Sequence, residues 1–522
     1  MRVHFIFPNF DCPLGVSIGL SYVAGMVKRA GHDVAVTHVA EGVGFPYDLE
    51  RVVDSVRTAD PGLVCISSGH NHYAETRQMV EAIETRLKVP VLLGGIHATL
   101  NVDDVLRENP SLSFLNIGEG EEATLDLVTA LDQGLDVTHI PNVQARTNGT
   151  VHRNAVRPFM NLADLADMET DMWEFQKVTD LRRGWVNVSA QRGCPYRCTY
   201  CHNNGVTKVL AQSLGKKSWS NSDLGYLRYR PADRMCAELK SLCEKYRIDA
   251  FSFIDDTFTM NRDWLRELLT LYQQEVDVPY VCNTTAVDID DETLKLMADT
   301  GCRVIRLGVE SGGAHILNDL LKRAWVSPKR IHWAFQRIQE HGMHALAFLM
   351  IGNLNETRDD TRLTFQFTAK IKPTSMRLAV AYPYPGTEYH DRARAANAVD
   401  PTRSSHNYLT RSVMRQDPEH DLWLDKVRTF YFWYINTFLG NESTPVFEKL
   451  VTELESLPRD KWNDPEVQRS LWRRHEAITN DFQERKVFHY TTPFADRTDI
   501  VISSLVVAEH GEIIRKEANE PH

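Results

Sequence analysis

Short apolar runs alternate with amphipathic stretches through residues 1–135. An amphipathic stretch such as SYVAGMVKRAG (21–31) has helical spacing, and strands that alternate with helices predict βαβ units and a parallel sheet. We therefore predict a doubly wound, flavodoxin-like or Rossmann-like α/β domain over 1–135. Its predicted strands are RVHFIF (2–7), DVAVTHV (33–39), GLVCISS (62–68), VPVLLGG (89–95) and LSFLNIG (112–118).

These predicted strands end in small or polar residues. In open α/β sheets ligands lie outside the carboxyl ends of the strands, and glycines there let a cofactor approach the backbone. We therefore expect a ligand-binding edge. Its candidate residues are Pro13, Gly15, Ser67, Ser68, Gly94, Gly95, His97, Gly118, Glu119 and Gly120.

Residues 136–183 break the βα rhythm. Two alternating runs, NVQARTNGTVHRN (142–154), flank Asn148-Gly149, which is a strong hairpin signal. The polar, Asp-rich passage 162–172 then has the composition of a linker. We assign 136–183 as a hairpin and an interdomain linker.

The βα rhythm returns over residues 184–394. Strands that alternate with helices here predict a partial (β/α)6 barrel, whose chemistry belongs at the carboxyl ends of the strands. The six predicted strands are WVNVSA (185–190), AFSFID (250–255), YVCNTT (280–285), RVIRLGV (303–309), ALAFLMI (345–351) and SMRLAVA (375–381).

Residues 395–522 lose the rhythm and are predicted to be mainly helical. The aromatic run VRTFYFWYINTFL (427–439) is interpreted as a packed amphipathic helix, and substrate choice is assigned to this region. A final hairpin is predicted in 498–517.

Composition limits the function classes. A chain of 522 residues is expected to form about three domains. A net charge of -11 argues against a general electrostatic grip on nucleic acid and favours a small-molecule substrate. The N-terminal stretch fits neither a signal peptide nor a membrane span, and the nine cysteines are typical of a reduced compartment, so we expect a cytoplasmic protein.

Three cysteines, Cys194, Cys198 and Cys201, have the spacing C-x3-C-x2-C directly after the first strand of the second series. A structural zinc site and an ordinary four-iron cluster each need four ligands. One interpretation is a zinc site completed by a remote cysteine or by His202, which is sterically awkward beside Cys201. We favour a four-iron cluster with one open iron, because an open iron can bind a cofactor directly.

The cysteine spacing, with Tyr200 before the last cysteine, resembles the radical S-adenosylmethionine (SAM) superfamily. The resemblance implies that Cys194, Cys198 and Cys201 hold a [4Fe-4S] cluster whose open iron chelates SAM. One electron from a flavodoxin-type or ferredoxin-type donor would then yield a 5′-deoxyadenosyl radical. Tyr200 is a candidate contact to these cofactors.

The same resemblance assigns residues at later strand ends to SAM. Asp255 and Asp256 would meet the methionine amino group, although a helix cap remains an alternative for Asp256. Glu310 and Ser311 match the ribose-contacting segment, and Gly352 matches the turn after the fifth strand. The sequence departs from the family at Leu354, Asn355 and Thr285, where Pro, Gly and Arg are usual.

The N-terminal domain resembles the cobalamin-binding domain of B12-dependent radical SAM enzymes, and the resemblance extends to about residue 390. The candidate edge residues named above would then contact cobalamin. A flavodoxin-like domain that serves only as a partner surface is the alternative. The Asp-x-His-x-x-Gly motif that ligates cobalt in related domains is missing, so we expect cobalamin without that ligand. His70 and His72 are expected to pack on the corrin or to face water.

The resemblance implies a methyltransferase that moves a methyl group from methylcobalamin to an unactivated carbon or phosphorus of a small metabolite, in specialised (antibiotic-type) biosynthesis. An oxidative cyclase or rearrangement enzyme with the same cofactors is the second hypothesis. A tRNA or protein methylthiotransferase fits less well, because only Cys12 and Cys65 precede the motif. A metal or corrinoid sensor is a further alternative.

Overall fold

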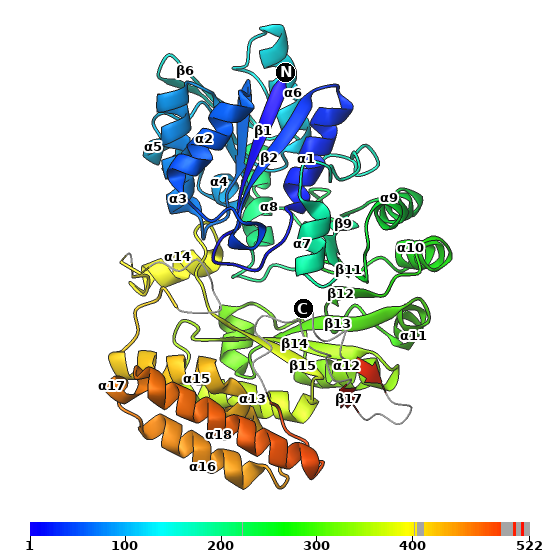
Figure 1. Cartoon of the computed structure of the whole chain (residues 1–522), viewed down its shortest axis with the longest axis vertical. Helices are drawn as coiled ribbons and strands as arrows, with labels where there is room; N and C mark the ends of the chain where they lie inside the picture. The colour runs from blue at the N-terminus through cyan, green and yellow to red at the C-terminus, as the bar shows by residue number, and fades with distance from the viewer. Residues whose placement is uncertain (222, 401, 404–411, 492–504, 508–512, 516–522) are drawn as a thin grey trace. The chain divides into compact units, whose positions relative to one another are not determined.

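The structure is a computed structural model. It describes residues 1–221, 223–400, 402–403 and 412–491, and the backbone of two further strands at 505–507 and 513–515. Internal contacts divide the chain into two compact units (Figure 1). Unit 1 comprises Met1–Asn283, Asp299–Cys302 and Pro383–Arg392, and unit 2 comprises Thr284–Ala298, Arg303–Tyr382 and Ala393–His522.

Unit 1 begins with a seven-stranded sheet in the order β2-β1-β3-β4-β5-β6-β7. The pairs among the first five strands are parallel, as predicted, and β6 and β7 add an antiparallel edge. The strands are β1 (Arg2–Pro8), β2 (Asp33–Val39), β3 (Leu63–Ser67), β4 (Val91–Gly94), β5 (Phe114–Asn116), β6 (Val143–Thr147) and β7 (Thr150–His152).

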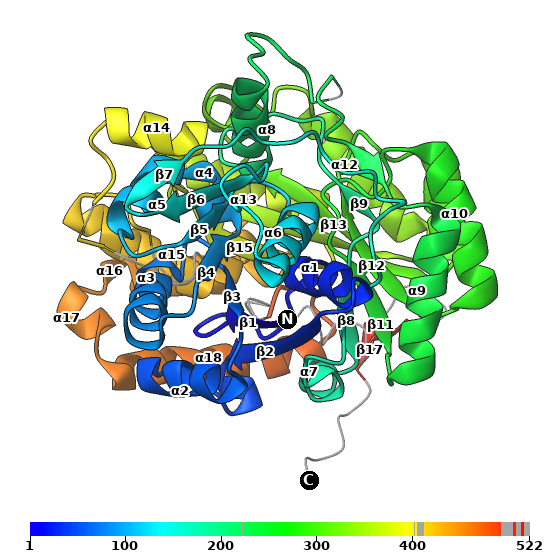
Figure 2. The ribbon, with the colours of Figure 1, turned by 90° about the horizontal axis from the view of Figure 1, so that it is seen from above.

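Helices cover both faces of this sheet, which confirms the doubly wound α/β class (Figure 2). Helices α1 (Ile18–Arg29) and α6 (Glu121–Gln133) pack together on one face, and α2 (Leu49–Ala59) and α3 (Tyr73–Ala82) pack on the other. Buried Val, Ile, Leu and Met side chains fill the core between the sheet and α2 and α3. The remaining helical segments are a 3-10 turn (Glu41–Val43), a π turn (Ile83–Leu87), α4 (Ile96–Leu100) and α5 (Val102–Glu108).

The predicted hairpin forms between β6 and β7. Asn148 and Gly149 both have positive φ, 50° and 78°, as a two-residue hairpin turn requires. The passage predicted as a linker is instead largely buried. Leu162, Leu165 and Met168 pack with Tyr22 of α1, because their apolar side chains cover that helix.

Unit 1 also holds the first strands of the second series. Strand β11 pairs in parallel with β8 and β12, and α9 packs against α10. The sequence did not predict the two-residue antiparallel pair formed by β9 and β10. The elements are α7 (Phe175–Leu181), β8 (Trp185–Val188), β9 (Gln191–Arg192), α8 (His202–Ser213), β10 (Arg228–Tyr229), α9 (Ala232–Lys245), β11 (Ala250–Phe253), α10 (Arg262–Glu275) and β12 (Tyr280–Thr284).

Unit 2 holds the later strands, and β14 pairs in parallel with β13 and β15. Each strand of the second series is followed by a helical segment, so the predicted (β/α)6 class is confirmed. The elements are α11 (Asp291–Asp299), β13 (Cys302–Glu310), a π turn (Ile316–Leu320), α12 (Pro328–Glu340), β14 (His344–Ile351), α13 (Arg358–Ile371), β15 (Ser375–Val380) and α14 (Glu388–Ala395).

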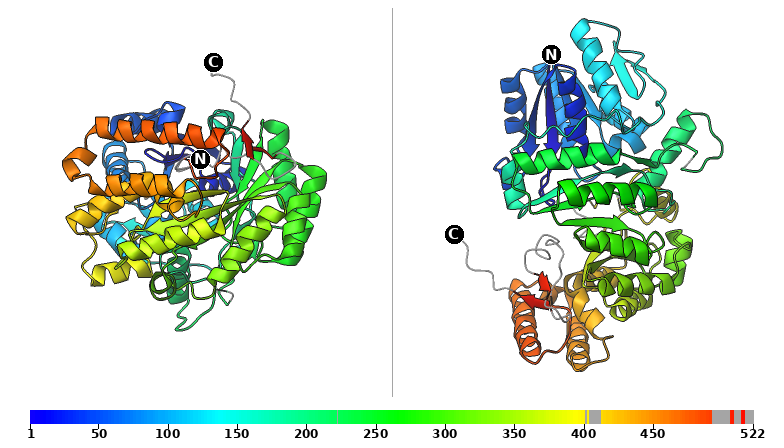
Figure 3. Two further views of the ribbon diagram at one scale, coloured as in Figure 1. Left: turned by 90° about the horizontal axis from the view of Figure 1, so that it is seen from below. Right: turned by 90° about the vertical axis from the view of Figure 1, so that its right-hand side faces the viewer.

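The C-terminal part of unit 2 is mainly helical, as predicted (Figure 3). The aromatic run lies on α15 and is a packed core, since Phe430, Phe432 and Trp433 are fully buried. The helices are α15 (Pro418–Asn436), α16 (Thr444–Ser456), α17 (Arg459–Trp462) and α18 (Pro465–Glu484), and β16 (Leu505–Val507) pairs antiparallel with β17 (Ile513–Arg515). The rest of the predicted final hairpin lies outside the described residues. Within the described part of the chain, no helix combines the length and apolar character needed to cross a membrane.

Candidate active site

A cavity of about 360 Å³ lies at the carboxyl edge of the N-terminal sheet. Six predicted edge residues line it: Ser67, Gly94, Gly95, Gly118, Glu119 and Gly120. Cys65, Tyr22, Ser189, Arg192 and Ile254 also contribute to its wall. The predicted ligand-binding edge is therefore a concavity in unit 1.

Gly95 is required by the geometry of this edge. Its φ is +95°, and a Cβ atom there would lie 2.6 Å from the carbonyl oxygen of Ser68. Ser68 is buried, and its hydroxyl donates to the carbonyl of Gly69 at 3.0 Å. The two backbone segments approach so closely at this point that a side chain larger than that of glycine does not fit at position 95.

Pro13 and Gly15 lie in the loop after β1 and are not among the residues that line the cavity. Asn9 organises this loop: its side chain donates to the carbonyl of Pro13 at 3.1 Å and accepts from the backbone N–H of Gly15 at 3.0 Å. Asn9 therefore sets the turn geometry of Pro13 and Gly15.

The histidines near this edge are buried against each other. Nδ1 of His70 lies 2.7 Å from Nδ1 of His97, and the ring of His70 also packs against His202 and Tyr384. The Nε2 atom of His72 lies 2.8 Å from the carbonyl oxygen of Phe10. Burial lowers the pKa of His70 to about 2, with His97 and His202 adding to the effect. Burial also lowers the pKa of His97 to about 4, so the rings of His70 and His97 are neutral packing groups.

A second cavity, of about 370 Å³, continues from the same edge. Gly95, Gly118, Glu119, Arg192 and Ile254 line both cavities. The second cavity is further lined by Gln191, Gly193, Tyr226, Arg228, Asp255 and Asp256, which come from the strands next to the cysteines. Ile254 is 43% exposed, so it offers an apolar surface between the two spaces.

The three cysteines come after Gly193 in the sequence, and Gly193 lines this second cavity. Gly193 has a φ of +92° and turns the chain into Cys194, and Cys201 directly precedes the first residue of α8. The side chain of Asn221 donates to the carbonyl oxygen of Cys194 at 2.6 Å. Burial raises the pKa of the Cys194 thiol, and Asp256, Cys201 and Cys198 act in the same direction. Tyr200 is half-buried in this loop.

Among the described residues, no group of three or more His, Cys, Asp and Glu side chains is arranged to hold a single metal ion. A four-iron cluster does not need such a group, because each cysteine ligates a different iron. The ring of His202 packs against His70 and Tyr384. The cluster assignment stays a prediction.

Asp255 and Asp256 follow β11 and differ in their surroundings. Asp255 is 3% exposed, and its Oδ1 accepts from the backbone N–H groups of Ala190 at 2.9 Å and Gln191 at 2.5 Å. Its Oδ2 has no hydrogen-bond partner in the described part of the chain. Burial raises the pKa of Asp255 to about 7. Burial also raises the pKa of Asp256, and a hydrogen bond from Asn203 opposes this.

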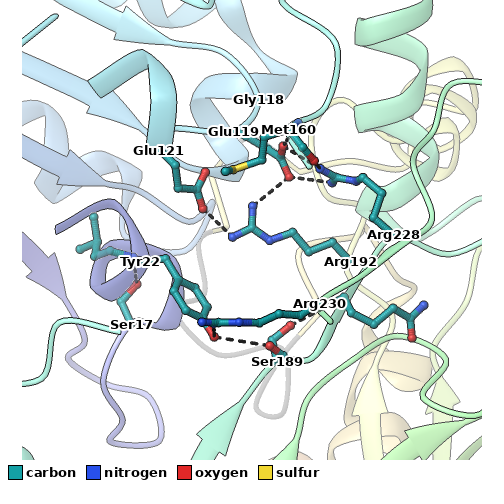
Figure 4. A network of polar contacts seen from close by, with 12 residues as sticks. Ser17, Tyr22, Gly118, Glu119, Glu121, Met160, Ser189, Arg192, Arg228 and Arg230 are labelled. Carbon is teal, nitrogen blue, oxygen red and sulfur yellow. Dashed lines mark hydrogen bonds and ion pairs between the residues drawn. The ribbon is translucent and has the colours of Figure 1, made fainter. Parts of the chain in front are cut away.

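Glu119 takes part in a network of charged groups beside both cavities (Figure 4). Its Oε1 accepts from Arg192 at 2.9 Å and from Arg228 at 2.7 Å, and Arg192 also contacts Glu121 at 2.5 Å. Burial alone would raise the pKa of Glu119, but Arg192 and Arg228 outweigh it and lower the pKa. Oε2 of Glu119 also accepts from Arg228, so both oxygens of this predicted cofactor contact accept hydrogen bonds from arginines.

The remaining predicted residues lie in unit 2. Glu310 ends β13 at an irregularity in the strand, with a φ of +64°, and its Oε1 lies 3.5 Å from Arg323. The hydroxyl of Ser311 accepts from the N–H of Gly313 at 3.1 Å. Gly352 has a φ of +69°, and nearby Glu356 accepts from the N–H of Asn353 at 2.7 Å. A strained, non-glycine left-handed residue at a strand end is a frequent feature of functional sites.

Sequence reasoning missed Arg192, Arg228, Tyr226 and Asn203. The hydroxyl of Tyr226 donates to the side-chain oxygen of Asn203 at 2.5 Å, and Asn203 in turn contacts Asp256. Tyr226 and Arg228 come from a segment without a recognisable pattern. Of these residues, only Arg192 could have been proposed from the sequence, because it lies two residues before Cys194.

Comparison with known protein families agrees with this arrangement. The B12 binding domain matches residues 14–128, and the radical SAM superfamily matches residues 188–368. The first match covers β2 to β5 with the glycine-lined edge, and the second covers the cysteines, Asp255, Asp256 and Glu310.

Individual relatives match this chain over most of their length. An uncharacterized methyltransferase of Pyrococcus horikoshii is 27% identical over 388 residues, which are 74% of this chain and 80% of the relative. An anaerobic magnesium-protoporphyrin IX monomethyl ester cyclase of Rubrivivax gelatinosus is 24% identical over 449 residues, which are 83% of this chain and 77% of the relative.

Among solved structures, the radical SAM methyltransferase TsrM of Kitasatospora setae, with cobalamin and a [4Fe-4S] cluster bound, matches with a TM-score of 0.60. The identity is 18%, and the match covers 76% of this chain and 79% of TsrM, so it supports the fold. With both family matches in the predicted order, the chain is an enzyme that belongs to the radical SAM superfamily, in the group that carries an N-terminal B12-binding domain.

Proposed function

We propose that this protein is a cobalamin-dependent radical SAM methyltransferase that moves a methyl group from methylcobalamin to an unactivated carbon or phosphorus of a small metabolite, in specialised (antibiotic-type) biosynthesis. The wall common to the two cavities of unit 1 carries this proposal. Glu119, Arg192 and Ile254 face both the edge of the B12-binding sheet and the strands that lead into the cysteine loop. A reaction that uses two cofactors together needs such a common wall.

Cys194, Cys198 and Cys201 would hold the [4Fe-4S] cluster, because three soft thiolates in one loop suit iron and leave one iron open. Asp255 and Asp256 would receive the amino group of SAM. The buried Oδ2 of Asp255 fits this role, because it lacks a donor in the described residues and an ammonium group would supply one. Tyr200, Glu310, Ser311 and Gly352 would complete the contacts to SAM.

The residues at the sheet edge would hold cobalamin. Gly94, Gly95, Gly118 and Gly120 let a bulky ring system approach the backbone, and the exposed Ile254 offers it an apolar contact. The described residues that line the two cavities include no histidine. Cobalamin would be bound without the histidine ligand of the Asp-x-His-x-x-Gly motif, which the sequence lacks.

Together the cofactors would supply a 5′-deoxyadenosyl radical, after one electron from an external flavodoxin-type or ferredoxin-type donor, and a methyl group carried on cobalt. The chain itself would position them and keep water out. Arg192 and Arg228 are largely buried, and two carboxylates, Glu119 and Glu121, pair with them, so this group adds no net charge beside the bound cofactors.

An oxidative cyclase is the second candidate, and the cyclase relative of Rubrivivax gelatinosus favours it. The two candidates use the same cofactors and differ in what leaves the site. Methyl transfer adds one methyl group to the product and consumes two SAM molecules per turnover, whereas cyclisation removes hydrogen and adds no methyl group.

The test does not need the substrate. The protein, reconstituted anaerobically with iron, sulfide and hydroxocobalamin, is incubated with a reductant and SAM that carries a deuterated methyl group. The expected result is labelled methylcobalamin together with 5′-deoxyadenosine. Formation of 5′-deoxyadenosine without label on cobalamin would contradict methyl transfer and favour the cyclase, and absence of both products would contradict the radical SAM chemistry.

A further inference from the structure

Two arginines stand directly opposite each other in the short ribbon formed by β9 and β10. Arg192 of β9 is the cross-strand neighbour of Arg228 of β10. Their side chains are only 22% and 13% exposed, so water screens their charges weakly. Like charges directly opposite each other destabilise a strand pair. The ribbon therefore needs a counter-ion.

Glu119 is placed as that counter-ion. One of its oxygens, Oε1, contacts Arg192 at 2.9 Å and Arg228 at 2.7 Å, and Oε2 accepts from Arg228 at 3.0 Å (Figure 4). Oε2 also accepts from the backbone N–H of Met160 at 3.2 Å. Glu121 adds a contact to Arg192 but none to Arg228 among the described hydrogen bonds and ion pairs. Among the described ion pairs, Glu119 is the carboxylate that contacts both arginines.

The ribbon fixes the position of the cysteine loop. Cys194 follows Arg192 by two residues, and at Gly193 the strands are so close that a Cβ atom would lie 2.2 Å from the carbonyl oxygen of Tyr226. From the same segment, Asn221 donates to the carbonyl oxygen of Cys194 at 2.6 Å. Separation of the two strands would thus displace Cys194.

Glu119 also belongs to the cobalamin side of unit 1. It lies between Gly118 and Gly120, and all three residues line the cavity at the edge of the B12-binding sheet. A ligand that orders this turn also orders the carboxylate that closes the ribbon. Such a link works in both directions, because the coupling free energy between two sites is reciprocal.

We propose that Glu119 is a positioning residue that couples cobalamin binding to retention of the iron–sulfur cluster, by placing one negative charge in contact with both opposed cations, Arg192 and Arg228. The inference rests on the proposed function, since it assumes that both cofactors bind in unit 1. It goes further in assigning an energetic link between their sites, carried by one carboxylate.

Three variants separate the link from a general structural role. Glu119→Gln keeps the size of the side chain and removes its charge. Glu119→Gln combined with Arg228→Gln also removes one of the opposed cations, and should restore part of what the single change loses. Glu122→Gln is the matched control, since Glu122 is 44% exposed and its partner Arg157 lies 3.6 Å away.

The first measurement follows amide hydrogen exchange in the full-length protein, with and without cofactors. Glu119→Gln should speed exchange in 190–194 and 226–229 by about tenfold, the range of typical coupling energies, while the double variant recovers part of the protection. Glu122→Gln should exchange like the wild type. Equal protection in Glu119→Gln and the wild type would overturn the role of the carboxylate.

The second measurement is the rate at which a chelator bleaches the cluster, with and without hydroxocobalamin. Cobalamin should slow bleaching by about tenfold in the wild type and in Glu122→Gln, and should have no effect in Glu119→Gln. Equal slowing in Glu119→Gln, or none in the wild type, would overturn the coupling. If no cluster forms or no cobalamin binds in the wild type, the proposed function itself fails, and the two failures are thereby distinguished.

Discussion

The strand ends of the two units are organised by different kinds of contact. In unit 1, Arg192 contacts Glu119 over 73 positions of sequence, and Gln191 contacts Asp255 over 64. In unit 2, Asn353 contacts Glu356, and Thr357 forms a reciprocal cap with Asp360, in each case three positions apart. The chemistry assigned to unit 1 thus depends on the tertiary fold, whereas the turn after β14 in unit 2 is set locally.

This difference predicts how each unit responds to substitution. A change at a strand end of unit 1 should be felt at residues distant in sequence, because buried charges and backbone donors lose their partners. A change in the turn after β14 in unit 2 should stay local. The predictions below test this contrast.

The largest expected effect is loss of the cluster. Cys198→Ala removes one of the three proposed ligands and should abolish 5′-deoxyadenosine formation while the protein still binds hydroxocobalamin. Visible spectra and product analysis after anaerobic reconstitution measure the two properties separately. Cys236→Ala is the control, because Cys236 is fully buried in α9 and belongs to no proposed site. Full SAM cleavage by Cys198→Ala would refute the ligand assignment.

The next effect concerns the glycine-lined edge of unit 1. Gly95→Ala places a methyl group 2.6 Å from the Ser68 carbonyl in a left-handed conformation, so this backbone must move. Cobalamin affinity should fall by at least about tenfold, as seen when binding-site geometry shifts slightly. Gly134→Ala has a φ of +64° with open space around it and should cost about 1 kcal/mol without any change in cobalamin binding. Unchanged affinity in Gly95→Ala would remove this edge from the cobalamin site.

Local sequence patterns predicted most of the fold. The strands of both series, the Asn148-Gly149 hairpin and the aromatic core helix all follow from periodicity and turn chemistry, which act between near neighbours. The 162–172 segment was interpreted as a linker because its acidic residues mask the apolar positions, among them Leu162 and Leu165, that pack on Tyr22. A mainly polar composition does not reveal which few apolar residues of a segment are buried.

The candidate site was predictable to different degrees. Glycines, strand-end carboxylates and the cysteines are visible in sequence because each sits at a fixed offset from a predicted strand. Arg228 and Tyr226 follow a segment without regular structure, and they reach the site only because β9 pairs with β10. The engagement of Glu119 by two arginines was likewise invisible, since ion pairs between distant residues leave no local signal.

Smaller effects are expected at two residues of unit 2 that have a positive φ, Lys372 at the end of α13 and Glu310 at the end of β13. Lys372→Gly should stabilise the protein by about 0.5–1 kcal/mol, because Lys372 ends α13 with a φ of +47°. Glu310→Gly should instead lower stability despite its φ of +64°, because the buried Arg323 loses a carboxylate. Thermal unfolding measures both, and SAM binding should weaken only in Glu310→Gly. A gain of stability in Glu310→Gly would show that the ion pair contributes little.

The smallest effect compares one buried carboxylate from each unit. Burial raises the pKa of Asp255 from 3.8 to about 7 and that of Glu356 from 4.5 to about 7. Each group binds its proton more tightly in the folded protein, so its contribution to stability is complete below the unfolded pKa and is lost as the pH rises through about 7. Asp255→Asn and Glu356→Gln should each flatten the fall in unfolding temperature over that window.

Asp136→Asn is a control in the same experiment, because the pKa of Asp136 is shifted in the opposite direction. Hydrogen bonds from the backbone and side chain of Thr138 lower the pKa of this exposed carboxylate. Its contribution to stability is therefore lost only as the pH falls below 3.8, and the pH dependence of the unfolding temperature up to pH 7 should not change.

Substitution of the two buried carboxylates should have different effects on SAM binding. SAM should perturb the electron paramagnetic resonance signal of the reduced cluster less in Asp255→Asn than in the wild type, because Asp255 holds the loop before Cys194 through Ala190 and Gln191. Glu356→Gln should leave that signal unchanged, since its contacts remain within its own turn; an equal loss in both variants would contradict the contrast between the units.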